Sequence, residues 1–124
     1  MNERHPRSGS EYENIRRLIH EAISVWEHNS NLKFREAHPS VANDADIRID
    51  FARLDHGDGF EFTGPSGTLA HAFPPGRGIG GDVHMDNDED WDIENGRKGD
   101  VSFFYTLLHE VRFNLFLEFK IILT

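Results

Sequence analysis

The stretch from His56 to Trp91 constrains the fold most, because it combines glycine-rich turns with side chains that bind metal ions. Its strongest potential ligands are His56, Asp58, His71 and His84. Imidazole nitrogens and carboxylate oxygens are ligands that a tetrahedral zinc ion takes at about 2 Å. A single histidine in a strand is more often a hydrogen-bonded structural residue, but four such groups in glycine-rich sequence indicate a metal site. The chain has no cysteine, so thiolate ligands and disulfides are excluded.

The bulk properties predict one small acidic domain. The 124 residues are 37% hydrophobic, which suits a single domain with a modest core. The net charge of −9 argues against nucleic-acid binding, which needs a basic surface. Carboxylates crowd the segment from Asp82 to Glu94, where bound divalent cations would relieve their repulsion. No apolar run is long enough to span a membrane, and the first residues lack the apolar core of a signal peptide.

Periodicity predicts a mixture of helices and strands. Residues 1–9 are expected to form a disordered tail, followed by a helix that Ser10 and Glu13 open as a capping box. This helix has an apolar stripe and is expected to end at Asn29–Asn31. A second helix is expected to begin after an N-cap at Asp100. Strand-like alternation occurs over residues 32–35, 45–51, 68–73 and 82–85.

The metal-rich stretch resembles the catalytic domain of the matrixin (matrix metalloproteinase) family of metzincin proteases. The similarity runs through His56-Gly57-Asp58, the segment from Gly64 to Gly76 that contains Leu69-Ala70-His71-Ala72-Phe73, and Gly78-Ile79-Gly80-Gly81-Asp82-Val83-His84-Met85-Asp86. It covers roughly residues 11 to 110. The resemblance implies an α+β, zincin-like fold with a twisted mixed sheet, helices and a metal-rich loop region. It also implies a zinc-dependent endopeptidase lineage that acts on extracellular matrix proteins.

The family's metal ligands can be carried over by position. The resemblance implies a structural zinc on His56, Asp58, His71 and His84. It implies one calcium ion held by Asp46, Asp82 and the carbonyls of Gly78 and Gly80. It implies a second calcium ion held by Asp86, Glu89 and the carbonyls of Gly64, Ser66 and Thr68. Thr63 stands where the family supplies another carboxylate to the second calcium, so that site is expected to be weakened.

The resemblance also implies a peptide partner. In the family, the strand that matches Thr68–Phe73 lies at a sheet edge and pairs with an extended substrate through backbone hydrogen bonds. Strand addition needs only an open edge with aligned amides and carbonyls, so it does not depend on catalysis. A glycine-flanked edge strand without any ligand is the alternative.

The catalytic motif breaks off after two residues. Metzincins use His-Glu-x-x-His-x-x-Gly-x-x-His, in which three histidines hold zinc and the glutamate is the general base. His109 and Glu110 match the start of this motif, but Phe113, Phe116 and Phe119 replace the second histidine, the glycine and the third histidine. One imidazole cannot hold a catalytic zinc, so His109 is a remnant ligand and this chain is expected to be inactive.

Residues 111–124 have two interpretations. Either the chain is a pseudo-enzyme with a diverged helix, or these residues are an unrelated apolar tail fused after Glu110; the abrupt break favours the second. The family's opening strand, methionine turn and closing helix are not matched, so residues 10–110 are expected to be a truncated domain. Three functions compete: an endopeptidase of an extracellular lineage, a non-catalytic zinc- and calcium-stabilised peptide-binding module, or a mis-spliced product without a stable fold.

Overall fold

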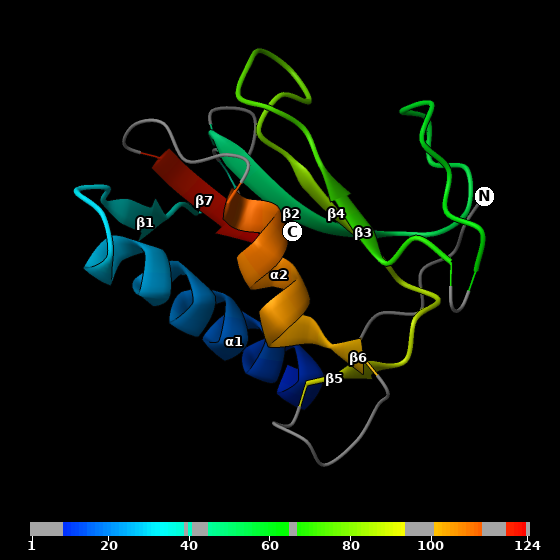
Figure 1. Cartoon of the computed structure of the whole chain (residues 1–124), viewed down its shortest axis with the longest axis horizontal. Coiled ribbons are helices and arrows are strands. Elements are labelled where there is room, and N and C mark those ends of the chain that lie inside the picture. The colour runs from blue at the N-terminus through cyan, green and yellow to red at the C-terminus, as the bar shows by residue number, and fades with distance from the viewer. Residues whose placement is uncertain are drawn as a thin grey trace.

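The computed structural model describes residues 9–38, 40, 45–64, 67–93, 101–112 and 119–123. Its elements are α1 (Gly9–His28), β1 (Phe34–Glu36), β2 (Ile47–Ala52), β3 (Ala70–Ala72), β4 (Val83–Asp86), β5 (Trp91–Asp92), β6 (Val101–Ser102), α2 (Phe103–Val111) and β7 (Phe119–Leu123). Five strands form one sheet in the order β1-β7-β2-β4-β3, and β5 pairs with β6 (Figure 1). The expected α+β architecture, a mixed sheet with helices, is confirmed.

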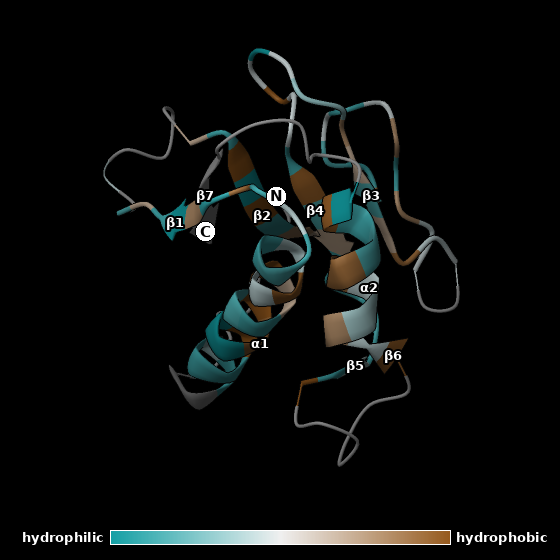
Figure 2. Ribbon diagram, turned by 60° about the vertical axis from the view of Figure 1, so that its left-hand side comes forward, coloured by the Kyte–Doolittle hydropathy of each residue, from teal (hydrophilic) through white to brown (hydrophobic). Residues whose placement is uncertain are grey.

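Helix α1 buries the apolar stripe that predicted it. Ile15, Leu18 and Ala22 are each 2% exposed or less and belong to the core shared with β2 and β4. The helix already includes Gly9 and Ser10, so the capping box expected at Ser10 and Glu13 does not open it. Residues 1–8 of the predicted tail lie outside the described part. The helix ends at His28, directly before the asparagines expected to stop it. Figure 2 shows the hydrophobic residues of α1, α2 and the central strands on facing surfaces.

The central strands position both the core and the metal-rich loops. In β2, alternate residues are buried, with Ile47 and Ile49 fully so, as the sequence alternation predicts. Every residue of β4 is buried. Val83 and Met85 enter the apolar core, while His84 and Asp86 alternate with them and so point to the other face. The alternation therefore explains how one short strand serves both core packing and polar chemistry.

Helix α2 begins later than predicted. Its N-cap is Ser102, whose hydroxyl accepts a hydrogen bond from the amide of Tyr105 at 3.2 Å. The N-cap predicted at Asp100 is therefore wrong, because Val101 and Ser102 first form β6 and the helix starts only after this strand. Asp100 itself lies outside the described residues. No helix among the described residues is long and apolar enough to cross a membrane.

Strand β7 comes from the segment that was expected to be an unrelated tail. It lies between β1 and β2 and is parallel to both, with Phe119 opposite Phe34 and Ile121 opposite Ile47. In the described sheet, β7 is the one strand that joins β1 to the rest. Residues 119–123 are thus part of the sheet, whereas the foreign origin of residues 111–124 stays a prediction.

A charged clamp holds β1 against α1. Arg16 donates two hydrogen bonds to the Glu36 carboxylate, at 2.8 and 2.7 Å, and His20 Nε2 lies 3.0 Å from the same group. The hydrogen bond from Arg16 lowers the pKa of Glu36 from 4.5 to about 2, although partial burial opposes the shift. The folded state therefore favours the ionised carboxylate.

The clamp predicts a pH-dependent contribution to stability. Because the folded pKa is depressed, the stabilisation is complete above pH 4.5 and is lost as the pH falls toward 2. Glu36→Gln is expected to lower Tm at pH 7 modestly, because solvent screens the pair, and to have a shrinking effect below pH 4.5. Thermal melts across pH 2–7 measure this. Glu21→Gln removes an exposed pairing with Arg17 and is the matched control; a Glu36→Gln deficit of constant size down to pH 2 would refute the assignment.

Candidate metal centre

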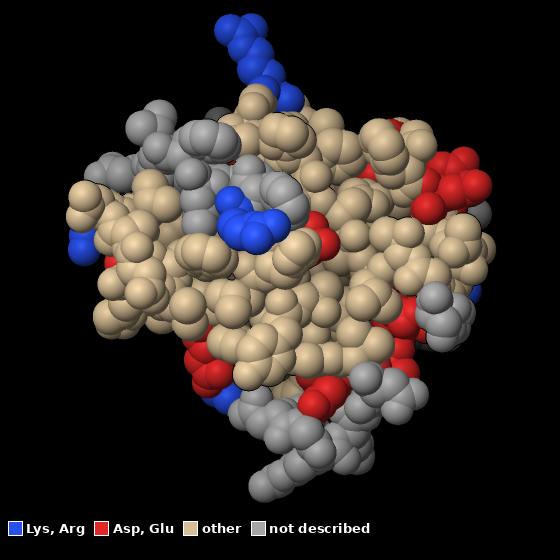
Figure 3. Space-filling model, in the orientation of Figure 1, with Lys and Arg blue, Asp and Glu red and all other residues tan. Residues whose placement is uncertain are grey.

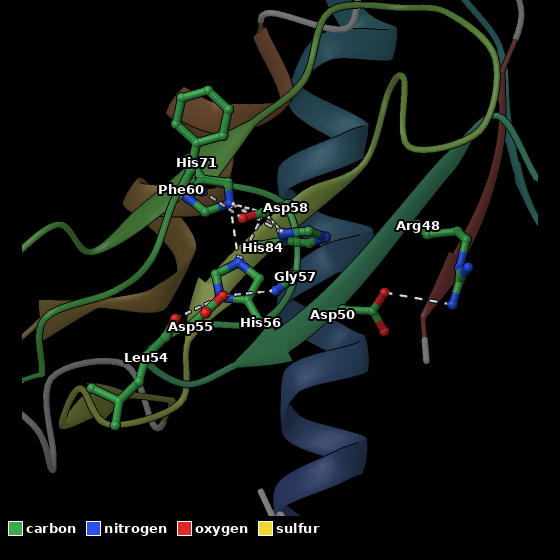
Figure 4. A network of polar contacts seen from close by, with 10 residues as sticks. All are labelled: Arg48, Asp50, Leu54, Asp55, His56, Gly57, Asp58, Phe60, His71 and His84. Carbon is green, nitrogen blue, oxygen red and sulfur yellow. Dashed lines mark hydrogen bonds and ion pairs between the residues drawn. The ribbon is translucent and has the colours of Figure 1, made fainter. Parts of the chain in front are cut away.

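Four potential ligands converge from three segments of the chain. His71 lies on β3 and His84 on β4, directly opposite each other in the antiparallel register. His56 and Asp58 lie in the loop after β2, and the flanking Gly57 and Gly59 have φ values of +89° and +80°. These left-handed conformations are easy for glycine alone, and they let the short loop turn both side chains toward the sheet (Figure 4).

The ligand atoms are close together. Asp58 Oδ2 lies 2.9 Å from His56 Nε2, His71 Nε2 and His84 Nδ1. The His71 and His84 nitrogens are 3.1 Å apart, and the His56 and His71 nitrogens 3.4 Å. These four residues are the one group of three or more His, Asp or Glu side chains in the described part of the chain whose atoms converge in this way.

The geometry suits a tetrahedral zinc ion. Four ligand atoms held about 2 Å from such an ion lie roughly 3.3 Å from one another, close to the spacings found here. Direct hydrogen bonds explain the arrangement less well, because Asp58 would need a proton on each of three nitrogens that also crowd one another. The residues therefore fit zinc, and the ion would cross-link the loop after β2 to strands β3 and β4.

Neighbouring groups orient the ligands. His56 Nδ1 donates a hydrogen bond to the Leu54 carbonyl at 2.8 Å, which leaves Nε2 free of a proton and facing the other ligands. The second oxygen of Asp58 accepts a hydrogen bond from the Phe60 amide at 2.8 Å. Phe62, 1% exposed, stacks on the His56 and His71 rings with centroids 4.9 and 4.8 Å away. The sequence analysis did not predict this aromatic contact, although Phe62 lies close to His56 and Asp58 in the sequence.

Electrostatics also favour a bound cation. Burial would raise the pKa of Asp58, but the Phe60 amide and the contacts with His71 and His84 outweigh it and bring the pKa to about 2. The carboxylate is thus ionised at neutral pH. Burial lowers the pKa of His84 and favours its neutral form, which is the form that binds metal.

One expected calcium site has a buried carboxylate at its centre. Asp82 is 6% exposed and accepts a hydrogen bond from the Arg48 amide at 3.2 Å. Burial raises the pKa of Asp82 to about 6. Gly81 has φ +85°, and a Cβ on it would lie 2.2 Å from the Asp46 carbonyl, so the backbones at Asp46 and Gly81, the residue before Asp82, are close together. Gly78 and Gly80 lie in the turn that leads into Asp82.

The second expected calcium site includes an unpartnered buried oxygen. Asp86 is fully buried; its Oδ1 accepts a hydrogen bond from the Asp88 amide at 2.9 Å, but its Oδ2 has no partner among the described groups. Burial raises the pKa of Asp86. Glu89 is 8% exposed and close enough to contribute to that rise. Gly64, Thr68 and Thr63 are described, whereas Ser66 lies outside the described residues.

The remnant of the catalytic motif lies apart from the candidate metal centre formed by His56, Asp58, His71 and His84. His109 and Glu110 are in the last turn of α2 and line an open groove of about 420 Å³ beside β3. His109 is exposed, and Glu110 is half-buried. Phe119, at the position of the third ligand, lies in β7 opposite Phe34, and residues 113–118 lie outside the described part. No three-ligand group forms here among the described residues.

The mixed sheet with helices, together with a histidine-aspartate group that could hold a metal ion, defines a candidate metal-binding α+β domain. The family model for matrixin matches residues 3–119, which is nearly the whole chain. The protein therefore belongs to the matrixin family, whose activity is that of zinc metalloendopeptidases.

Curated relatives support this assignment. The chain is 43% identical over 111 residues to matrix metalloproteinase-2 of Drosophila melanogaster, covering 88% of this chain and 14% of that protein. It is 44% identical over 101 residues to human matrilysin, covering 82% of this chain and 36% of the relative. Human matrix metalloproteinase-17 is 40% identical over 100 residues, covering 80% and 16%. The chain thus spans well under half the length of these relatives.

Proposed function

We propose that this chain is a zinc-stabilised matrixin domain that binds extended peptides without cleaving them. The observation that carries the proposal is the contrast between two sites. Four ligands converge at the centre formed by His56, Asp58, His71 and His84, whereas His109 has no second imidazole within its motif. Zinc at the first site supplies cross-linking, and hydrolysis by a zinc-bound water needs an ion at the second.

The exposed edge of β3 supports the peptide-binding part of the proposal. Strand β3 ends the five-stranded sheet, so within the described part of the chain its outer side has no strand neighbour. The Leu69 carbonyl and the Phe73 amide both bond to the β4 side, at 2.9 Å. Backbone groups alternate along an antiparallel strand, so the amides and carbonyls of Ala70 and Ala72 face outward and can pair with an added strand.

Peptides with methylated amides test strand addition without altering the protein. The probe is a fluorescein-labelled, end-blocked octapeptide of threonine and valine with a central norleucine, titrated by anisotropy against the zinc-loaded chain. Methylating the two central amides on one side of the extended peptide should weaken binding about tenfold, because two backbone hydrogen bonds are lost. Methylating the alternate amides should weaken it much less. Equal losses for both peptides would rule out strand addition.

We also propose calcium binding at two sites, one at Asp46, Gly78, Gly80 and Asp82, and the other at Gly64, Ser66, Thr68, Asp86 and Glu89. The buried carboxylates of Asp82 and Asp86 support this, because a buried anion without a cation is costly. We also propose an extracellular setting and matrix proteins as ligands, which the resemblance to matrixins implies.

Calcium is expected to raise Tm. If the ion binds only the folded state at ten times its Kd, it adds about 1.4 kcal/mol, or roughly 5 °C for a domain of this size. Thr63→Asp should enlarge the response by restoring a charged ligand. Thr63→Asn should do so less, because its amide has the shape of the Asp carboxylate without the charge. Differential scanning calorimetry with calcium and with magnesium measures both effects. If calcium leaves Tm unchanged in the unmodified chain and in both variants, these sites are excluded.

A further inference from the structure

The groove beside β3 has an apolar side and a side with polar and charged groups. Leu69 and Ala70 form one side, and α2 supplies the other through Tyr105, Thr106, His109 and Glu110. Since α2 packs against β3, the groove runs along the strand edge to which we assign peptide binding. A strand added there would direct alternate side chains toward α2, so the groove's chemistry determines which of them it accepts.

The groove contains the carboxylate of Glu110, and within the described part of the chain His109 is the one cationic group that acts on it. Among the described residues, no hydrogen bond or ion pair engages the Glu110 carboxylate, and it is half-buried. A partly desolvated carboxylate is stabilised by an opposite charge that a ligand brings. The neighbouring Thr106 hydroxyl is already occupied, because it donates to the Ser102 carbonyl at 2.8 Å.

An aromatic ring offers a second contact for a cation. Tyr105 is 70% exposed, although it is a large aromatic residue. It precedes His109 by four positions, so both lie on the same side of α2. Lysine and arginine groups are attracted to the faces of such rings, especially where the surroundings are partly desolvated. On the face shown in Figure 3, which carries α2 and β3, basic groups lie near the centre and at the edges, and acidic groups are scattered among neutral ones.

We propose that this groove selects extended peptides carrying a lysine or arginine side chain, whose cation pairs with Glu110 and lies against Tyr105. The inference rests on the proposed peptide binding at β3 and specifies its ligand. Glu110, the residue that matches the family's general base, here becomes a specificity-determining binding residue. Apolar and acidic side chains at the same peptide position leave the carboxylate unpaired or repelled.

The test compares three octapeptides that differ at one position. The norleucine probe is matched by versions with lysine or glutamate at the centre, all titrated against the zinc-loaded full chain at low ionic strength. The lysine peptide is expected to bind about fivefold more tightly than the norleucine peptide, and the glutamate peptide more weakly than both. Salt should reduce the difference.

Two variants separate local pairing from the overall acidic charge. Glu110→Gln is expected to reduce the lysine-to-norleucine ratio to about one. Glu21→Gln on α1 changes the net charge equally and lies outside the groove, so it should keep the ratio. A ratio near one in the unmodified chain, or a ratio that survives Glu110→Gln, overturns the proposal.

The outcomes also separate this inference from the proposed function. Equal affinity for the three peptides, together with the alternating effect of amide methylation, would remove the charge selection and leave strand addition in place. Failure of all three peptides to bind would overturn both. A lysine preference that Glu110→Gln abolishes and Glu21→Gln preserves supports both.

Discussion

Removal of zinc is expected to lower Tm by roughly 15 °C. A ligand that binds only the folded state contributes about 4 kcal/mol at a thousandfold excess over its Kd, and a domain of this size loses several degrees per kcal/mol. The effect should be large because the ion would join the loop carrying His56 and Asp58 to two strands at once. Without it, the ionised Asp58 carboxylate and three crowded imidazoles remain, with the Asp58 side chain only 3% exposed.

Thermal melts with a chelator, and after zinc is restored, measure this effect. Zinc, but not magnesium, should recover the original Tm, because magnesium prefers oxygen ligands in an octahedral arrangement. The ion should also be lost as the pH falls below the imidazole range, since histidine must be neutral to bind it. If neither the chelator nor added zinc changes Tm, this centre does not have the structural role assigned to it.

The second large effect is the absence of peptidase activity. Active enzymes accelerate slow hydrolyses by a factor of at least about a million, so the expected deficit is of that order against an active matrixin assayed in parallel. His109 supplies one zinc ligand where three are needed, and Glu110 then has no zinc-bound water to activate. The triple variant Phe113→His, Phe116→Gly and Phe119→His is also expected to stay inactive, because residue 119 belongs to β7.

A fluorogenic peptide assay with and without chelator measures this activity. The unmodified chain and Glu110→Ala should give the same background rate. Chelator-sensitive cleavage that Glu110→Ala abolishes would show that a catalytic zinc is held in some other way and would overturn the proposed loss of activity.

The zinc-type centre could be anticipated because its ligands occur in recognisable local sequence. Histidines and an aspartate among glycines indicate a metal site, and the resemblance to matrixins groups His56, Asp58, His71 and His84. The proton position on His56 could not be read in advance, since it depends on the Leu54 backbone carbonyl. The unpaired oxygen of Asp86 likewise arises from tertiary burial, which sequence periodicity does not report.

The least predictable element was β7. Its residues read as an apolar tail because their partners in β1 and β2 lie more than seventy positions earlier in the chain, and no local pattern encodes such pairing. The start of α2 was also missed, because β5–β6 pairing moves the N-cap from Asp100 to Ser102. The misplaced N-cap is a case in which tertiary contacts outweighed local propensity.

The zinc content of the purified chain tests the account most directly. Elemental analysis after exhaustive dialysis should give one zinc ion per chain, lost in the double variant His71→Ala and His84→Ala and kept in His109→Ala. Two zinc ions per chain would mean that the catalytic position is also filled and would contradict the proposed loss of activity. No zinc, or one ion that depends on His109 rather than on His71 and His84, would contradict the assigned centre.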